Sequence, residues 1–295
     1  MEFEEQLSKY RKIVNEELEK YIDKKDVPEK RLNQSKEYSL TAGGKRIRPI
    51  LVLATYNLFK NDFEKVMPYA IAIEMVHNFS LIHDDLPGID NDDFRHNKLA
   101  NHKKFNEATA ILAGDSLLNE AYMVISKDLK NSKKEEIGNK IEIFSEFTAA
   151  INQMIVGEYV DTEVEGKEIS KELLEYIHKN KTGAFLELCV KMGAILGNAS
   201  KEDIKKLSNY AQKIGLAFQI KDDILSEEGT QDILGKPVGN DKKLKKCTYI
   251  SEYGLQESKN ILDKIIKEAI EELKQYGEKA EFLKEFAIYI KSRNK

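Results

Sequence analysis

Apolar residues recur three or four positions apart along most of the chain, which is the spacing of one face of an α-helix. In residues 2–24 the series begins with Phe3, Leu7 and Tyr10 and predicts an amphipathic helix. A second helix is expected from Pro28, because proline fits the first turn of a helix. Further helices are predicted over 49–59, 68–85 and 107–127. After a connection over 128–140, another helix is predicted to end at about 157. The remaining predicted helices cover 170–180, 182–197, 200–225 and 253–275, with a short one before the basic tail.

Few chain breaks interrupt these patterns. Residues 41–44 form one break, a polar loop with Pro87-Gly88 covers 84–101, and residues 128–140 read as a solvated connection. Strand alternation is nearly absent, and the chain shows no internal repeat and no linker that would divide it. The pattern therefore predicts an all-α protein with a single domain over residues 1–295.

Composition excludes several classes of protein. No apolar run approaches the roughly 20 residues that a membrane-spanning helix requires, so no stable membrane insertion is expected. A net charge of −4 argues against general nucleic-acid binding. The charged N-terminus lacks a signal-peptide core, and two cysteines, Cys189 and Cys247, cannot build a disulfide framework. These features predict a cytoplasmic protein.

Two acidic clusters follow apolar segments. Residues 83–93 hold five aspartates after the run 79–82, and Asp222-Asp223 follow residues 216–218. A solvated acidic loop is the alternative interpretation. However, two carboxylates about 6 Å apart repel each other by roughly 3 kcal/mol at an effective dielectric near 20, so clusters beside apolar segments favour a bound cation. Ligand sets made only of oxygen suit Mg²⁺, which also accepts phosphate oxygens of a substrate.

A glycine turn, Gly43-Gly44, precedes the cations Lys45, Arg46 and Arg48. Glycine allows the backbone to approach an anion, and arginine binds phosphate through two parallel hydrogen bonds. Further lysines lie beside glycines in 181–183 and 235–237. Each fragment alone is typical of a solvated basic turn. Together with the acidic clusters, they suggest a diphosphate substrate held between Mg²⁺ and basic side chains.

Six blocks of the chain, in order, resemble the trans-isoprenyl diphosphate synthase (polyprenyl synthetase) family, and most closely its bacterial farnesyl diphosphate synthases. These blocks are GGKRIRP (43–49), EMVHNFSLIHDDLPGIDNDD (74–93), GDSLL (114–118), KTG (181–183), FQIKDDIL (218–225) and GKPVGND (235–241). The resemblance covers essentially the whole chain. It implies a helical bundle around a central active-site cavity, and a homodimer.

The resemblance also implies roles for the matching acidic residues. Asp84 and Asp90 would ligate Mg²⁺ with support from Asp85, and Asp222 would hold a third ion with help from Asp223. Three Mg²⁺ ions are expected, and Mn²⁺ could replace them. Asp84, Asp90 and Asp222, with Arg95 and Lys181, would form the catalytic set.

The substrates implied are isopentenyl diphosphate and an allylic diphosphate, dimethylallyl or geranyl diphosphate. The residues expected to bind the first are Gly44, Lys45, Arg48, His77 and His96. Those expected at the second are Arg95, Lys181, Lys236 and Lys246, with Thr182 and Gln219 facing the carbocation. In the implied reaction the allylic diphosphate ionises, the double bond of isopentenyl diphosphate attacks the cation, and a proton is lost.

The chain length of the product is expected to depend on Phe79. In the family, the residue five positions before the first aspartate often forms the floor of the product pocket, and here it is Phe79, followed by the small Ser80. A phenyl ring at that depth would stop elongation by steric overlap. This residue favours a C15 product, farnesyl diphosphate, over the C20 product of a geranylgeranyl diphosphate synthase.

Two departures from the family pattern keep other functions open. Ser226 replaces the last carboxylate of the second motif, and His96 stands where an arginine is usual, so a non-catalytic or regulatory paralogue is one alternative. His83-Asp84 prompts a second, a metal-dependent phosphohydrolase, which needs several histidines from a chain that has five. A terpene cyclase shares the acidic motif, but the basic block 43–49 argues for a second diphosphate.

Overall fold

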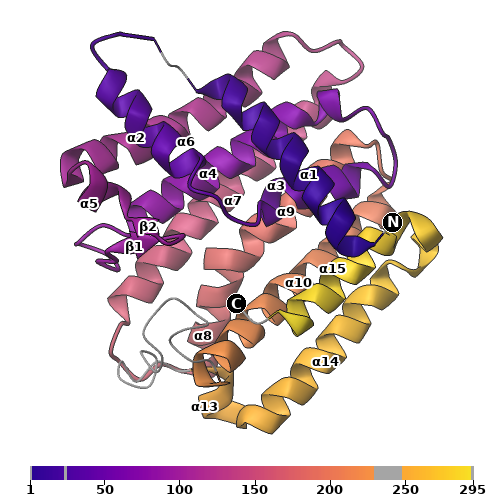
Figure 1. The fold of residues 1–295 in the computed structure, drawn as a ribbon. Helices are drawn as coiled ribbons and strands as arrows, with labels where there is room; N and C mark the ends of the chain where they lie inside the picture. Colours follow the sequence, from indigo (N-terminus) through magenta and orange to yellow (C-terminus); the bar gives the residue numbers. More distant parts are fainter. Residues whose placement is uncertain (1, 23–24, 229–247, 294–295) are drawn as a thin grey trace. The chain divides into compact units, whose positions relative to one another are not determined.

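The computed structural model describes residues 2–22, 25–228 and 248–293, and the fold over these residues is all-α, as predicted (Figure 1). Contacts divide the chain into two compact units. The first unit comprises residues 1–56 and 60–141, and the second comprises 57–59 and 142–295. The single domain over 1–295 stays a prediction. No helix in the described ranges is long and apolar enough to span a membrane.

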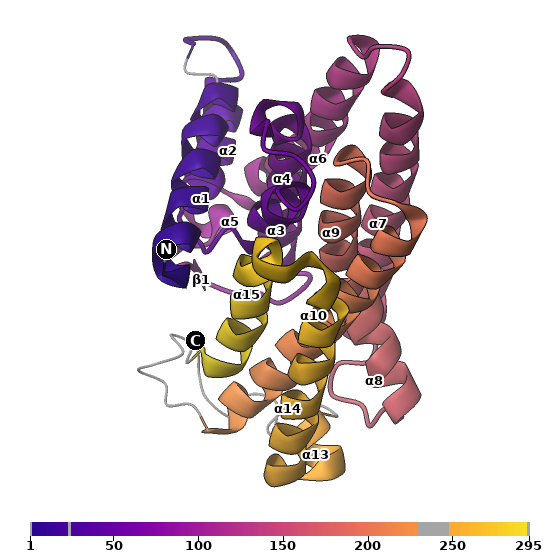
Figure 2. The same ribbon diagram turned by 90° about the vertical axis from the view of Figure 1, so that its right-hand side faces the viewer.

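The first unit is built around one helix that is apolar on nearly all sides. This helix, α4, begins after Val66 with Pro68 in its first turn, and it packs mainly against α6 (Figures 1 and 2). A helix that is apolar all round must be buried, and α4 forms the core of the unit. The elements of the unit are α1 (Phe3–Leu18), η1 (Glu19–Tyr21), α2 (Lys30–Leu40), α3 (Ile47–Tyr56), η2 (Phe63–Lys65), α4 (Met67–Asp84), β1 (Phe94–Arg95), β2 (Lys98–Leu99), α5 (Asn101–Lys104) and α6 (Glu107–Lys130).

The second unit is centred on α10, which packs against α9 and α14 (Figure 2). Tyr210 of α10 is fully buried, and its hydroxyl donates a hydrogen bond of 2.7 Å to the carbonyl of Leu283 in α15, so the polar end of this core side chain is satisfied. The helix α7 (Ile137–Glu163) belongs to this unit from residue 142 onward. The other elements are α8 (Lys171–His178), the π-helical turn η3 (Lys179–Gly183), α9 (Ala184–Leu196), α10 (Lys201–Glu228), α13 (Tyr249–Tyr253), α14 (Leu255–Glu272), η4 (Lys274–Ala280) and α15 (Glu281–Ser292).

Several predicted boundaries were wrong, and each has a local cause. The helix predicted over 253–275 corresponds to α14, which begins two residues later, at Leu255, because Gly254 with its φ of 75° ends the preceding helix α13. The solvated connection predicted over 128–140 is shorter, because α6 continues to Lys130 and α7 begins at Ile137. Lys140 forms an ion pair of 2.9 Å with Asp128, so charged residues there are held by one another.

The polar loop 84–101 also contains a hairpin that the sequence pattern did not show. Phe94 pairs with Leu99 and Arg95 with Lys98, which leaves His96 and Asn97 as a two-residue turn. Both turn residues have positive φ, 49° and 61°. A tight hairpin turn requires this conformation, and histidine and asparagine adopt it more readily than most residues.

Candidate functional site

The three cations of the basic turn in the first unit differ in burial: Arg46 is buried, whereas Lys45 and Arg48 are half-buried. Gly43 and Gly44 have φ of 107° and 102°, and Arg46 has φ of 56°. This backbone turns Arg46 inward, where it hydrogen-bonds Asn15 at 3.0 Å and Glu74 at 2.5 Å. The side chains of Arg46 and Glu74 are only 5% and 3% exposed. Arg46 therefore anchors the turn and is not accessible to a ligand.

The structure brings Arg48 and His77 together, two residues that the sequence analysis expects at the same diphosphate. Arg48 Nη1 lies 3.2 Å from His77 Nε2. Burial, and then the positive charge of Arg48, lower the pKa of His77 well below its usual value. Because a guanidinium can only donate, Nε2 of a neutral His77 accepts this hydrogen bond. Lys45 is half-buried in the same turn.

His96 lies beside the glycine turn. A β-carbon on Gly44 would lie 3.3 Å from His96 Cε1, so the predicted pair does meet. Burial, and then Arg95, lower the pKa of His96. At neutral pH this position therefore carries an uncharged ring where the family pattern has an arginine.

The first acidic motif begins where α4 ends. Asp84 is the last residue of the helix and Asp85 its C-cap. The backbone N–H of Asp90 donates to the carbonyl of Asp84 at 2.8 Å, which folds the loop back over the helix end. Since the C-terminus of a helix carries partial negative charge, carboxylates there are disfavoured unless a cation is present.

Arg95 supplies one such cation. Its Nε donates to Asp85 Oδ1 at 2.9 Å, and its Nη2 lies 3.5 Å from Asp92. Asp85 is buried, with a side chain 3% exposed. In the described structure Arg95 thus binds the acidic motif itself, although the sequence assigned it to the allylic diphosphate.

Phe79 lies one turn before the acidic motif and is buried, 7% exposed. Its ring contacts the His83 imidazole edge-on at 4.8 Å between centroids. His83 in turn packs on α6 at Gly114, where a β-carbon would lie 2.3 Å from His83 Nε2. The glycine of the GDSLL block is thereby explained by close packing. Ser80 donates to the carbonyl of His77 at 3.0 Å.

In the second unit Lys181 is held by two carboxylates of α7. Its Nζ lies 2.6 Å from Asp161 and 2.8 Å from Glu158. Burial alone would lower the pKa of Lys181, but these two charges outweigh burial and raise it above its ordinary value. Lys181 is therefore a permanent cation.

The turn that carries Lys181 is π-helical and tightly enclosed. A β-carbon on Gly157 of α7 would lie 2.3 Å from the backbone nitrogen of Lys181. A β-carbon on Gly215 of α10 would lie 3.2 Å from Gly183 Cα. Two glycines thus let two helices approach the backbone of η3, and single π turns in helices often mark functional positions.

Thr182 and Gln219, predicted to face the carbocation, do meet: Gln219 Nε2 donates to Thr182 Oγ1 at 3.2 Å. They line a pocket of about 240 Å³ together with Lys181, Asp161 and Asp223. Asp223 Oδ2 accepts the backbone N–H of Tyr249 at 2.8 Å.

Asp222 binds a residue far away in the sequence. Its Oδ1 accepts a hydrogen bond from Nη2 of Arg293, the C-cap of α15, and this nitrogen also donates to the carbonyl of Phe218 at 3.1 Å. The guanidinium stacks on the Phe218 ring, 3.8 Å from its centroid.

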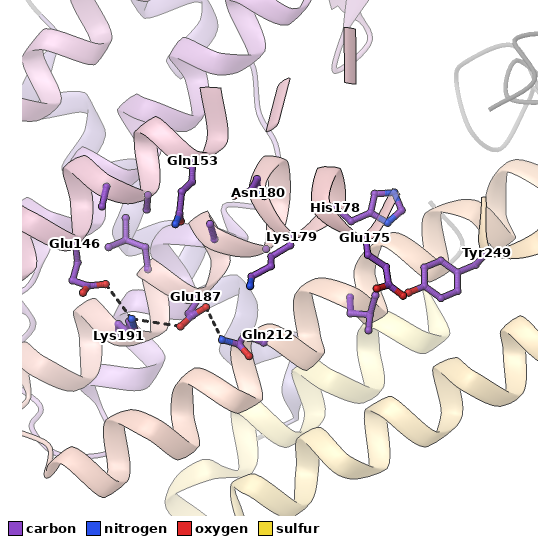
Figure 3. Close-up of a pocket in the computed structure, with 16 residues that line it drawn as sticks. Glu146, Gln153, Glu175, His178, Lys179, Asn180, Glu187, Lys191, Gln212 and Tyr249 are labelled. Carbon is purple, nitrogen blue, oxygen red and sulfur yellow. Dashed lines mark hydrogen bonds and ion pairs between the residues drawn. The ribbon is translucent and has the colours of Figure 1, made fainter. Parts of the chain in front are cut away.

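A larger pocket of about 640 Å³ in the second unit is lined by none of the site residues that the sequence predicts, although Tyr249 lies in its wall (Figure 3). Lys191 bridges Glu146 at 3.0 Å and Glu187 at 3.5 Å, and Gln212 binds Glu187 at 3.0 Å. The lining holds three glutamates, Glu146, Glu175 and Glu187, and two lysines, Lys179 and Lys191.

The chemistry of the donors fits a divalent metal. Each acidic motif offers carboxylate oxygens, the ligands that Mg²⁺ prefers. Within the described residues, no three acidic, histidine or cysteine side chains are already grouped to hold an ion. Arg95 and Arg293 instead neutralise Asp85 and Asp222. Lys236 and Lys246 lie outside the described residues.

Sequence reasoning missed four partners of the site. Glu158 and Asp161 stand three residues apart on a helix, so their shared face was a usable signal. No sequence signal pointed to Arg293 or to the N–H of Tyr249, because their partners Asp222 and Asp223 are distant in the chain.

Comparison with known proteins gives a consistent result. The family model described as polyprenyl synthetase matches residues 29–286. The chain is 40% identical over 292 residues to a farnesyl diphosphate synthase of Micrococcus luteus, covering 99% of each chain. It is 42% identical to that of Bacillus subtilis (89% of this chain, 88% of the relative). It is also 43% identical to a geranylgeranyl diphosphate synthase of Cyanophora paradoxa (87% of this chain, 86% of the relative).

Solved structures agree. The crystal structure of an FPP/GFPP synthase from Zymomonas mobilis matches with a TM-score of 0.87 and 30% identity, over 98% of this chain and 99% of that chain.

Proposed function

The chain belongs to the polyprenyl synthetase family, whose members condense isopentenyl diphosphate with allylic diphosphates, and we propose that it makes farnesyl diphosphate. It is a trans-prenyltransferase, and enzymes of this family depend on a divalent metal. One observation carries the proposal: residues predicted to share a substrate lie in contact with each other. Arg48 contacts His77, Lys181 is held by an ion pair with Asp161, and the neighbouring Thr182 accepts a hydrogen bond from Gln219. The two acidic pairs accompany these contacts.

The metal in this proposal is Mg²⁺, as three ions, with Mn²⁺ able to replace it. Asp84, Asp85 and Asp90 would hold it in the first unit, and Asp222 and Asp223 in the second. Bound there, the metal would stabilise negative charge that develops on the departing diphosphate.

Cationic side chains would bind the two substrate diphosphates. Lys45 and Arg48 would bind isopentenyl diphosphate beside Gly44, with the neutral rings of His77 and His96 as hydrogen-bonding partners. Lys181 would bind the allylic diphosphate, with Arg95, Lys236 and Lys246. The carboxylates of Glu158 and Asp161 orient the ammonium group of Lys181 before the substrate arrives. Cations that are already fixed in place reduce the cost of ionising the allylic C–O bond.

After ionisation, Thr182 and Gln219 would face the carbocation with their oxygen atoms. The hydrogen bond of 3.2 Å from Gln219 Nε2 to Thr182 Oγ1 restrains both side chains. The double bond of isopentenyl diphosphate attacks the cation, and the released diphosphate takes the proton. No side-chain nucleophile is required.

Phe79 supports a C15 product. Its ring is buried on α4 and contacts the His83 imidazole edge-on. A geranylgeranyl diphosphate synthase is the second candidate, favoured by the Cyanophora paradoxa relative.

We also propose a cytoplasmic homodimer. Exposed apolar side chains on two helices support a second copy as partner: Leu112 and Met123 on α6 are 57% and 59% exposed, and Ile155 and Tyr159 on α7 are 45% and 64% exposed. Cys189 is buried, and its thiol donates a hydrogen bond of 3.1 Å to the carbonyl of Phe185; a reduced cysteine suits a reducing compartment. Light scattering after gel filtration should give about twice the chain mass of 33.8 kDa.

One experiment tests the main proposal. The purified chain is incubated with Mg²⁺, isopentenyl diphosphate and a C5, C10 or C15 allylic diphosphate, and the dephosphorylated products are sized by chromatography. Mainly C15 from the C5 and C10 substrates, with little use of the C15 substrate, supports the proposal. Mainly C20 selects the second candidate, and no condensation product contradicts both.

A further inference from the structure

Arg293 closes the second acidic pair from the buried side. Its side chain is 6% exposed, whereas that of Asp222 is 45% exposed, so the guanidinium approaches the carboxylate from within the second unit and leaves the other side of Asp222 toward solvent. Any ion arriving from solvent would therefore meet a carboxylate whose inner oxygen is already bound.

Asp222 is one of several groups that hold Arg293 in place. Its Nη2 donates to the carbonyl of Phe218 at 3.1 Å, its guanidinium lies 3.8 Å from the centre of the Phe218 ring, and its backbone N–H donates to the carbonyl of Tyr289 at 2.9 Å. Phe218 and Asp222 are four residues apart and thus neighbours on one face of α10. Arg293 is fixed against the same face and would remain there after Asp222 gained another ligand.

This placement is costly for stability alone. The Nε of Arg293 is buried and has no hydrogen-bond acceptor among the described residues. A buried donor without an acceptor destabilises the folded state, and buried groups of this kind call for an explanation other than packing.

We propose that Arg293 is a positioning residue for the metal site: it holds Asp222 by its inner oxygen so that the carboxylate presents its exposed side to a divalent cation. The proposal rests on the proposed function, in which Asp222 is a metal ligand. Partners that orient a metal ligand typically change metal affinity by about 10–100-fold when they are removed. The alternative, in which Arg293 only competes with the metal for Asp222, predicts an effect of opposite sign.

The chain offers a matched control on the same helix. Lys291 lies two residues before Arg293, also carries one positive charge, and forms an exposed ion pair of 2.9 Å with Asp263. Lys291→Gln removes the same charge as Arg293→Gln without touching Asp222. Arg293→Lys keeps the charge but loses the planar group that binds carboxylate and ring together.

The test measures binding of Mn²⁺ alone to chelator-treated protein, from the decrease in the electron paramagnetic resonance signal of free Mn²⁺, with helicity checked by circular dichroism. Arg293→Gln should weaken binding about 10-fold or more, Arg293→Lys less, and Lys291→Gln not measurably. The Mg²⁺ concentration for half-maximal turnover should rise in the same order, with a smaller change in kcat at saturating Mg²⁺.

The outcomes separate the two proposals. Binding by Arg293→Gln that equals or exceeds that of the unsubstituted chain overturns the positioning role, and tighter binding identifies a competitor. Asp222→Asn serves as the reference. If Asp222→Asn binds Mn²⁺ and turns over normally, the metal assignment itself fails, whatever Arg293 does.

Discussion

The two acidic pairs are bound by arginines that stand at very different distances in the chain. Arg95 lies ten residues after Asp85, on a hairpin that follows the motif, whereas Arg293 lies 71 residues after Asp222, at the end of α15. The first pair also ends its helix, while α10 continues past the second pair to Glu228. The first motif is thus a local construction, and the second depends on the folding of the whole C-terminal part of the second unit.

The largest effect is expected from removing one ligand of each pair. Asp84→Ala and Asp222→Ala should each lower kcat by about 10²–10³-fold, since either change removes a group that helps to stabilise charge in the transition state. Steady-state kinetics with isopentenyl and geranyl diphosphates provides the measurement. Asp93→Ala is the control, because Asp93 is an exposed member of the same acidic loop that pairs with Lys103. Near-normal turnover of either ligand variant would contradict the metal assignment.

A second change tests the helix that leads into the first pair. Phe79→Ala should shift the product from C15 toward C20 or longer by opening the pocket floor. It should also cost about 3 kcal/mol or more in the free energy of unfolding, because Phe79 is buried and the change leaves a cavity. Product sizing and urea unfolding measure the two effects. Unchanged product length at reduced stability would mean that Phe79 is only a core residue.

The second unit contains a histidine that should make the protein sensitive to acid. Burial lowers the pKa of His178 to about 4, and its ring stacks on Tyr249. Because the unfolded pKa is near 6.5, the folded state disfavours protonation, and stability is lost as the pH falls from 6.5 toward 4, by about 2–3 kcal/mol from this group.

His178→Phe keeps an aromatic ring and removes the titration. The free energy of unfolding, measured in urea at several pH values, should then fall less between pH 6.5 and 4. The pH dependence that remains in His178→Phe includes a contribution from His77 in the first unit, because burial also lowers the pKa of that residue. Identical slopes for the two proteins would show that His178 is protonated without cost.

Glycines allow close approach in both units, but against different atoms. At Gly114 a β-carbon would meet the end of the His83 side chain, which can rotate, whereas at Gly157 it would meet the backbone of Lys181. Gly157→Ala should therefore cost about 1–3 kcal/mol in unfolding free energy and also raise KM for the allylic substrate. Gly114→Ala should cost less, since part of the clash is relieved by the side chain and alanine favours helix. Equal losses in urea unfolding would remove this distinction.

The smallest effect is expected at His96. Its lowered pKa keeps it neutral at pH 7–8, so His96→Arg adds a permanent charge and should lower KM for isopentenyl diphosphate about threefold to tenfold at pH 8. The positive φ of 49° limits the gain, because arginine fits this turn less well than histidine. Asn97→Gly, at the other turn position, is the control for turn strain. A KM that does not fall would place His96 away from that diphosphate.

Local features of the fold and site could be predicted from the sequence. The helices, the break at 41–44 and the pairs Arg48–His77 and Thr182–Gln219 follow from periodicity and from motifs whose members lie on one helix face or in blocks that the family resemblance brings together. The tight turn His96–Asn97 was missed because two-residue strands leave no alternation to detect.

Interactions between distant residues could not be predicted. Nothing in the tail sequence marks Arg293 as buried, and a basic C-terminal segment usually indicates a solvated end. Nor could the sequence separate Arg46 from Lys45 and Arg48, because three neighbouring cations look alike until backbone torsions direct one of them inward.

The inward direction of Arg46 affects how mutational data on this block are to be understood. An alanine scan of the basic turn would return a loss of activity at each cation, yet the cause at Arg46 would be a misfolded turn, because its removal strands the buried carboxylate of Glu74 without a counter-charge. Restoring neutrality, as in Arg46→Met combined with Glu74→Leu, should recover folded protein. No second substitution of that kind should restore Arg48, whose proposed role is to bind the ligand. Rescue by a second substitution therefore separates residues that build this site from residues that act in it.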